Sequence, residues 1–199
     1  MITESTAVPP TAHLSAADEP ELVRAPRTTF VSIRGRGRPG TEAFYRSKEL
    51  VRAVAHALPP ALRVADAADV VELLYWYPDD AAPVEIADFY WVNPIDTLEY
   101  RVLAQVDGAT TAEDLAAAAR AAGAAGAEPE LFTLPDRPVA QVMHHGPFAG
   151  ELDTLARLGA FAASRGVRRV GAHHEIHLDP FTADTPQDHL RTILRDPVG

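Results

Sequence analysis

Alternating and helical patterns of apolar side chains divide the chain into six expected strands and three expected helices. In residues 28–34 ("TTFVSIR"), apolar and polar side chains largely alternate, as on a strand with one buried face. Residues 41–58 instead carry apolar side chains three and four positions apart and run into Pro59 and Pro60, as does a helix with one buried side. The other expected strands span 69–78, 97–106, 137–146, 172–178 and 189–198, and the other helices span 111–122 and 149–166.

The order of these elements is strand, helix, strand, strand, and it occurs twice. Each of the two units also has a strand with a glutamate, Glu72 or Glu175, that a proline follows a few residues later. We therefore predict an α+β fold in which two pseudo-symmetric β-α-β-β halves, residues 27–125 and 130–199, form one antiparallel concave sheet. Helices are expected to cover one face of this sheet, and the opposite face is expected to line a groove.

Residues 1–26 have no apolar period and are rich in proline, alanine and acidic side chains. We expect this segment to be a flexible or loosely docked leader before the folded domain, residues 27–199. No stretch approaches the ~18 apolar residues of a membrane span, and the first residues lack the pattern of an export signal. The chain also has no cysteine, so we expect a cytoplasmic protein without a membrane partner, and we expect a monomer.

The net charge of −10 argues against a nucleic-acid partner, because phosphates would be repelled over most of the surface. One segment, "GRGRPG" at 35–40, has the glycine spacing of a dinucleotide-binding turn between a strand and a helix. Pro39 removes a backbone donor from that turn, and the repeated β-α-β-β order does not build a parallel doubly wound sheet. We interpret the segment as a glycine-rich turn, with a nucleotide site as the alternative.

Three histidines and a glutamate crowd the segment "GAHHEIHLDP" at 171–180. Alternate side chains of a strand share a face, so His173, Glu175 and His177 are expected on one side and Ile176 on the other. We expect Ile176 to pack beneath a helix. Glu175 is then expected to face the groove.

The two histidines beside Glu175 make a metal site one interpretation of this segment. Side chains two positions apart on a strand stand ~6.5 Å apart, so His173 and His177 could converge only with a ligand from another strand, such as His145. The spacing also differs from that of the helical H-E-x-x-H motif. We therefore predict no metal and no other cofactor.

A second interpretation makes Glu175 the charged group of a ligand-binding groove. A carboxylate in an apolar groove is stabilised by a cationic ligand, and aromatic walls add cation–π attraction. All five tyrosines and both tryptophans lie between Tyr45 and Tyr100, and Trp76 is expected in the groove because it shares strand parity with Glu72. The candidate ligand-binding residues are Glu175, Trp76, Tyr75, Trp91, His173, His177 and His145.

A third interpretation makes Glu175 a catalytic general base or acid. A carboxyl group with a raised pKa suits this role when it lies within reach of water and an electrophile. The G-x-S-x-G motif of serine hydrolases does not occur, so acyl transfer by a serine nucleophile is not expected.

Four segments resemble the stand-alone members of the GyrI-like small-molecule-binding family. They are residues 30–51, 142–167, 171–180 and 188–198, and the likeness extends over about residues 28–198. The C-terminal part is the most specific, because H-x-G-P-[FY], a helix, G-x-H-H-E-I and L-x-T-I-L-R-x-P-V occur there in that order.

The resemblance implies a duplicated β-α-β-β fold with a concave groove, and it implies that Glu175 matches the groove glutamate that contacts cationic drugs in regulator members. It thus implies a multidrug-type binding protein for bulky, aromatic, preferably cationic small molecules, without a DNA-binding domain. Some stand-alone relatives hydrolyse cyclopropane-bearing alkylators, so the alternative is a hydrolase in which Glu175 activates or positions water. His177 stands where the family usually has tyrosine, which leaves the partner of Glu175 in any reaction open.

Overall fold

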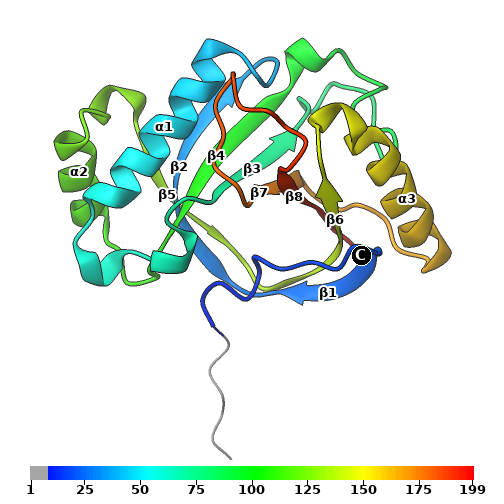
Figure 1. The fold of residues 1–199 in the computed structure, drawn as a ribbon, viewed down its shortest axis with the longest axis horizontal. Helices are drawn as coiled ribbons and strands as arrows, with labels where there is room; N and C mark the ends of the chain where they lie inside the picture. Colours follow the sequence, from blue (N-terminus) through cyan, green and yellow to red (C-terminus); the bar gives the residue numbers. More distant parts are fainter. Residues whose placement is uncertain (1–8) are drawn as a thin grey trace, which may run out of the picture.

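A computed structural model describes residues 9–199, which form one antiparallel eight-stranded sheet with three α-helices packed on it (Figure 1). The strands are β1 (Glu21–Ala25), β2 (Thr28–Arg36), β3 (Val71–Trp76), β4 (Glu99–Val106), β5 (Glu130–Leu134), β6 (Arg137–His145), β7 (His173–His177) and β8 (Arg191–Pro197). The helices are α1 (Glu42–Ala57), α2 (Ala112–Ala121) and α3 (Glu151–Ser164). The predicted α+β class with one antiparallel sheet is confirmed.

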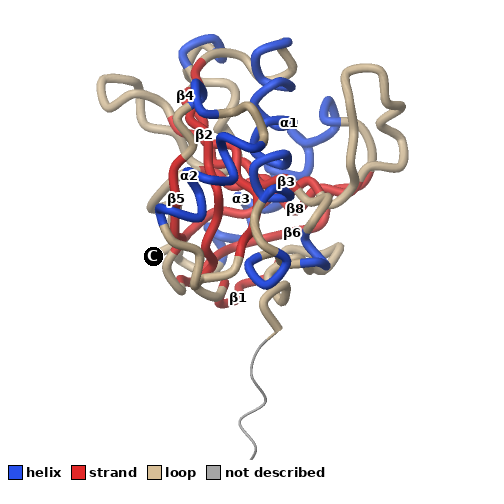
Figure 2. The backbone as a smooth tube through the Cα atoms, turned by 90° about the vertical axis from the view of Figure 1, so that its left-hand side faces the viewer, coloured by secondary structure: helices blue, strands red, loops and turns tan. Residues whose placement is uncertain are grey.

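The strand order across the sheet is β1-β6-β8-β7-β3-β4-β2-β5. The two strands β7 and β3 are neighbours at its centre, and Leu73 of β3 lies opposite Glu175 of β7. Strand β3 belongs to one half of the sheet, whose chain order is β2, α1, β3, β4. Strand β7 belongs to the other half, whose chain order is β6, α3, β7, β8. Figure 2 shows the strands in the middle of the molecule, with helices and loops around them.

Helix α1 begins after Thr41, whose side-chain oxygen accepts a hydrogen bond from the backbone N–H of Phe44 at 3.3 Å. It ends before Pro59 and Pro60, which cannot continue a helix. Helix α2 begins with a capping box between Thr111 and Asp114. These local signals explain why the helices occur close to where the sequence predicts them.

All three helices cover the same face of the sheet. Leu73 packs in the core beneath α1 and α2, and Leu194 packs in the core beneath α3. Glu175 lies between these two leucines in the strand register, so its side chain points to the helix-covered face. The groove was expected on the face opposite the helices, and this expectation is wrong. The open space above Glu175 lies on the helix-covered face, between α1 and α3. Ile176, expected beneath a helix, packs on the other face of the sheet.

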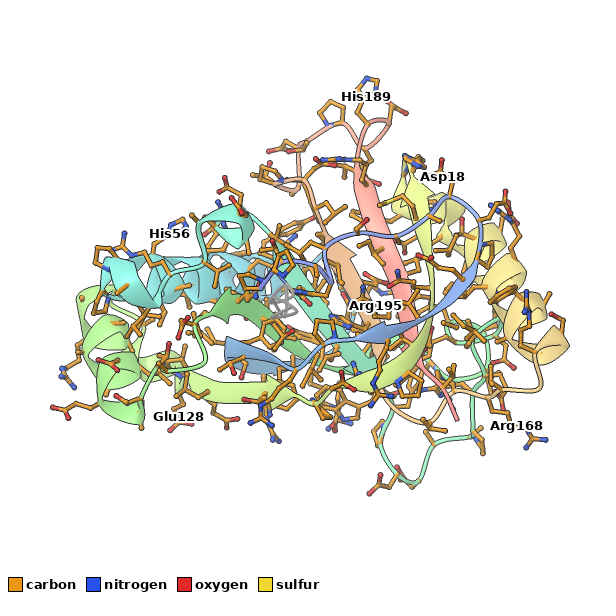
Figure 3. All side chains as sticks on the ribbon, turned by 90° about the horizontal axis from the view of Figure 1, so that it is seen from below. Asp18, His56, Glu128, Arg168, His189 and Arg195 are labelled. Atoms are coloured by element: carbon orange, nitrogen blue, oxygen red, sulfur yellow. The ribbon has the colours of Figure 1, made fainter. Side chains whose placement is uncertain are left out.

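The segment expected to be a flexible or loosely docked leader packs against the sheet in its described part, residues 9–26. Strand β1 pairs with the edge of β6, and the residues before it cross the sheet face opposite the helices. Figure 3 shows the N-terminal chain passing close to Arg195, whose guanidinium donates to the backbone carbonyl of His13 at 2.6 Å. Strand β1 was not predicted, because its partner strand is far away in sequence. Glu21 pairs with Gln141, 120 residues later. Strand β5 at the opposite edge was also missed.

Candidate functional site

A cavity of about 390 Å³ opens between α1 and α3 above the centre of the sheet, and we call it the central cavity. A volume of this size is typical of a site for a small molecule. Strands β3 and β7 form its floor through Tyr75, Glu175 and His177. Seven aromatic side chains line the cavity: Tyr75 in the floor, and Phe44, Tyr45, Tyr90, Trp91, Phe148 and Phe181 around it.

Glu175 is the charged group on the floor of the central cavity and is 4% exposed. Its Oε1 accepts a hydrogen bond from the hydroxyl of Tyr90 at 2.6 Å. Its Oε2 accepts a hydrogen bond from Nε2 of His177 at 3.1 Å, and Nε2 of His173 lies 3.6 Å from Oε1. The two hydrogen bonds fix the orientation of the carboxylate, and the nearby ring of His173 helps to stabilise its negative charge.

The histidines decide the ionisation state of Glu175. Burial opposes its charged form, but hydrogen bonds and positive charge from His173 and His177 outweigh burial and hold the pKa of Glu175 below its usual value. Burial also opposes the charged form of His173, yet the carboxylate of Asp196, 3.0 Å from Nδ1, helps raise its pKa to about 10. At neutral pH an imidazolium at His173 therefore lies between the carboxylates of Asp196 and Glu175.

A second carboxyl group, Glu151 at the start of α3, lines the same cavity and is 5% exposed. Burial and the nearby charge of Glu175 raise the pKa of Glu151 well above its usual value, so both favour its neutral form. Its Oε1 has no hydrogen-bond partner within residues 9–199. The cavity thus contains two carboxyl groups whose pKa values are shifted in opposite directions.

Lys48 of α1, the only lysine in the sequence, lies beside this charge cluster. Its Nζ is 3.4 Å from Nδ1 of His177 and 3.3 Å from the centre of the Phe181 ring. Burial lowers the pKa of Lys48 to about 7, against the opposing attraction of Glu175. A second cavity, of about 410 Å³, adjoins Lys48 and shares Tyr45, His177 and Phe181 with the central cavity.

The structure brings together four of the residues predicted to bind a ligand. Glu175, Tyr75, Trp91 and His177 all line the central cavity. His173 is fully buried behind Glu175 and does not line the cavity; it contacts Glu175 and the ring of Tyr90, which do.

Trp76 and His145 do not line the central cavity. The prediction for Trp76 rested on its parity with Glu72, but the register places Leu73 opposite Glu175. Trp76 consequently points to the other face, where its Nε1 donates to Glu99 at 2.8 Å. The exposed ring of His145, at the end of β6, has its Nε2 2.8 Å from a carboxylate oxygen of Asp18.

Sequence reasoning missed several residues of the site, most of them in loops or on helices. Tyr90 belongs to the "FYW" segment at 89–91, from which only Trp91 was chosen, and Phe148 is the aromatic residue of the H-x-G-P-[FY] motif. These two signals could have identified them. Glu151 and Lys48 carry no comparable signal, because only the packing of α3 and α1 beside β7 brings them to Glu175. Phe181 lies in the loop that follows β7.

The "GRGRPG" segment forms the expected glycine turn. Gly37 and Gly40 have φ angles of 103° and 83°, which glycine adopts readily. The sheet is antiparallel, so the parallel-sheet context of a dinucleotide site is missing. The metal interpretation also lacks support, because residues 9–199 contain no group of three or more histidine, aspartate or glutamate side chains placed to hold a metal ion.

Within the described part of the chain, no helix is both long and apolar enough to cross a membrane. The longest helix, α1, has 16 residues and carries charged side chains on its outer side.

The sequence matches no protein-family model and no curated protein. Among solved structures, the fold is similar to that of an uncharacterized conserved protein from Listeria innocua, with a TM-score of 0.74, 21% identity and coverage of 94% of this chain and 95% of that one. A Listeria innocua protein described as a hydrolase gives a TM-score of 0.72 at the same identity and coverage. SAV2435, solved with bound tetraphenylphosphonium, gives a TM-score of 0.50 at 15% identity and covers 91% of this chain and 94% of its own.

These similarities lie below 25% identity and concern the fold. The neighbours with this fold include one protein solved with a small aromatic cation and one described as a hydrolase. The chain therefore has a fold that is found both with a bound small molecule and in a protein described as a hydrolase.

Proposed function

We propose that this protein binds bulky aromatic small molecules, preferably cationic ones, in the central cavity. One observation carries the proposal: seven aromatic side chains surround a drug-sized space whose floor holds the carboxylate of Glu175. Aromatic faces attract cations and offer large contact areas, and a buried carboxylate favours a positive ligand. The bound tetraphenylphosphonium of SAV2435 supports this ligand class, and the shared fold supports membership of the GyrI-like small-molecule-binding family.

Trp91 provides a natural reporter for binding. It is 67% exposed at the central cavity, whereas Trp76, the other tryptophan, lies on the opposite face of the sheet. A large exposed aromatic side chain beside an apolar cavity is typical of a binding site. A ligand in the cavity should therefore change the fluorescence of Trp91 and leave that of Trp76 nearly unchanged.

The test is a fluorescence titration with tetraphenylphosphonium and planar cationic dyes. We expect Trp76→Phe to keep the ligand response and Trp91→Phe to lose it. Glu175→Gln should weaken binding about tenfold, as the loss of about 1.4 kcal/mol of charge attraction predicts. Glu113→Gln, which removes one exposed charge from α2, is the matched control and should bind like the wild type.

Two outcomes would contradict the proposal. The first is the absence of a fluorescence response to any ligand of the panel. The second is equal affinity of the Glu175→Gln and Glu113→Gln variants, because Glu175 would then contribute no charge attraction.

A second candidate function is the hydrolysis of an electrophilic, cyclopropane-bearing xenobiotic, with Glu175 positioning or activating water. The 2.6 Å contact between the Tyr90 hydroxyl and Glu175 favours it, because it provides a carboxylate and a hydroxyl donor within one cavity. The neighbour described as a hydrolase supports it as well. A carboxylate whose pKa is held low is a weak general base, which makes binding the primary proposal.

Mass spectrometry distinguishes the two functions. The protein is incubated with a cyclopropane-bearing alkylator, and the products are searched for the mass of one added water. Hydrolysis that is lost in both Glu175→Gln and Tyr90→Phe would establish the second function. Product no greater than in a protein-free control would exclude it for that substrate class.

A further inference from the structure

Glu151 is a buried carboxyl group that no neighbour satisfies. It is the first residue of α3, it is 5% exposed, and it lines the central cavity. Its Oε1 has no hydrogen-bond partner among residues 9–199. Buried polar atoms are nearly always hydrogen-bonded, so a carboxyl group beside the cavity with an unpartnered oxygen is a candidate to interact with a ligand.

Glu175 differs from Glu151 in its partners. Tyr90 and His177 donate to its two oxygens, and His173 lies within ion-pair distance. Its charge is therefore already compensated in the free protein. A cation that enters the cavity is attracted in part by Glu175, but it changes the ionisation of Glu175 little.

The charged and titratable groups around Glu151 come from five parts of the fold. They are Glu175, His173 and His177 of β7, Tyr75 of β3, Tyr90 in the loop before β4, His144 of β6, which lies 2.9 Å from the Thr154 hydroxyl of α3, and Lys48 of α1, which lies beside His177. Burial of Glu151 is nearly complete and the charge of Glu175 acts on it, and both favour the neutral form of Glu151. The N-terminus of α3 favours the ionised form, because the helix dipole is positive there.

We propose that a cationic ligand binds in the central cavity with release of the proton of Glu151, so that this residue supplies the negative charge that appears on binding. The O–H bond of the carboxyl group breaks, the proton passes to solvent or buffer, and the carboxylate pairs with the cation. A neutral aromatic ligand with a hydrogen-bond acceptor binds instead to the protonated form, which donates to it. This inference rests on the proposed function, because it requires that the central cavity take a ligand.

The consequence is a ligand affinity that depends on pH in opposite ways for cations and neutral molecules. A cation placed beside a buried carboxyl group lowers its pKa by about one to three units. Where binding releases one proton, affinity rises about tenfold per pH unit. Neutral acceptors should bind with constant affinity below the pKa of Glu151 and more weakly above it.

The experiment is titration calorimetry with tetraphenylphosphonium and with neutral triphenylphosphine oxide, each in two buffers of different ionisation enthalpy. We expect binding of tetraphenylphosphonium at pH 7 to release protons and binding of the oxide to release none. Glu151→Gln keeps the shape of the side chain but cannot titrate, so proton release should vanish. Asp153→Asn, on an exposed position of the same helix, should release the proton as the wild type does.

Lys48 is the other group close to the cavity that could lose a proton, since its pKa is about 7. A Lys48→Met variant separates the two sources. Proton release that persists in Glu151→Gln and disappears in Lys48→Met would overturn the inference. Binding of tetraphenylphosphonium without proton release would overturn it as well, while the proposed function would stand.

Infrared spectroscopy tests the inference in the free protein, independently of binding. We expect an absorption band of a protonated carboxylic acid at neutral pH in the wild type and its absence in Glu151→Gln. If the band is absent from the wild type, Glu151 is ionised already and the inference fails. If the band is present but no cation binds, the proposed function fails and proton release fails with it.

Discussion

Two buried glutamates, Glu72 and Glu175, lie on opposite faces of the sheet, and each is flanked by two histidines. His13 and His174 lie 2.7 and 2.8 Å from the two oxygens of Glu72. The difference between the two sites is the third partner: Glu175 also accepts a hydrogen bond from Tyr90 and borders the central cavity. The same residue types therefore form a closed cluster on one face of the sheet and a cluster that borders the central cavity on the other.

At the residue scale, the Tyr90 hydroxyl should stabilise the protein. Tyr90→Phe removes a hydrogen bond to a charged carboxylate, so we expect the free energy of unfolding to fall by about 1–3 kcal/mol. Tyr77→Phe is the matched control, because the Tyr77 hydroxyl has no hydrogen-bond partner in the described residues, and its effect should stay within about 0.5 kcal/mol. Urea unfolding measures both values. Equal losses for the two variants would show that the Tyr90 bond is not formed.

Lys48 gives a prediction about pH. Burial lowers the pKa of its folded form to about 7 from an ordinary value of 10.5. Between these values the unfolded chain binds the proton and the folded protein does not, so this group makes stability rise with pH by up to about 1.4 kcal/mol per pH unit. The free energy of unfolding of the wild type relative to Lys48→Met should therefore increase from pH 7 to pH 10.

The comparison with Lys48→Met is necessary because the titration of His173 makes the free energy of unfolding fall as pH rises. Burial opposes its charged form, but Asp196 helps raise its pKa to about 10, so its contribution is present below its ordinary pKa of 6.5 and is lost as pH rises toward 10. Both proteins contain His173, so subtracting the free energy of unfolding of the variant from that of the wild type removes the contribution of His173. A flat difference between the two proteins from pH 7 to pH 10 would mean that Lys48 keeps an ordinary pKa.

At the scale of elements, the N-terminal segment covers the sheet face that has no helices. The backbone carbonyls of its residues accept hydrogen bonds from side chains of the sheet: Pro10 from Gln105, His13 from Arg195, and Ser15 from Gln141. The ring of His13 is 4% exposed above Glu72. The segment therefore supplies partners for buried polar groups that the sheet alone leaves unsatisfied.

His13→Ala should destabilise the fold by about 2–4 kcal/mol, because it leaves the buried carboxylate of Glu72 with one partner fewer. Burial opposes ionisation of Glu72, yet His13 and His174 hold its pKa below the usual value. This stabilisation is thus present at neutral pH and is lost as pH falls through the lowered pKa. Chemical unfolding at neutral and acidic pH measures the effect.

The matched control is His145→Ala, which removes an exposed histidine that also contacts an acidic side chain, Asp18. Exposed pairs of this kind contribute little, so we expect a change within about 0.5 kcal/mol. A His13→Ala variant as stable as His145→Ala would show that the N-terminal segment does not stabilise the sheet.

At the scale of the whole molecule, one continuous sheet joins two apolar cores. One core lies beneath α1 and α2, the other lies beneath α3, and the pairing of β3 with β7 connects them. The central cavity spans the boundary, with α1 on one side and α3 on the other. A ligand in the cavity therefore contacts both halves and should stabilise them together.

Because the sheet is continuous, we predict that both halves unfold in a single transition. Leu158→Ala, in the core beneath α3, should lower the stability of the entire protein by about 2–5 kcal/mol. Leu22→Ala, at a side chain that is 41% exposed, should change it by about 0.5 kcal/mol. Coincident transitions of tryptophan fluorescence and circular dichroism support one unit, and separate transitions would reveal two.

Much of the fold could be predicted from local pattern. The helical period, the capping residues and the proline stop define α1, and alternation defines β2, β6 and β8, because these signals act over a few neighbouring residues. Strands β1 and β5 escaped prediction because an edge strand takes its stability from a distant partner. For the same reason the sequence did not reveal that residues 9–26 are docked.

The sequence by itself determined that His173, Glu175 and His177 share one face of a strand, because the period of two is a property of the extended backbone. Only the tertiary structure decided which face that is and which residues meet Glu175. The register of β3 against β7 selects Tyr75 over Trp76, and the packing of α1 and α3 brings Lys48 and Glu151 to the site. The charges of these groups follow from the same packing, because burial and neighbouring charges set each pKa and neither is encoded locally.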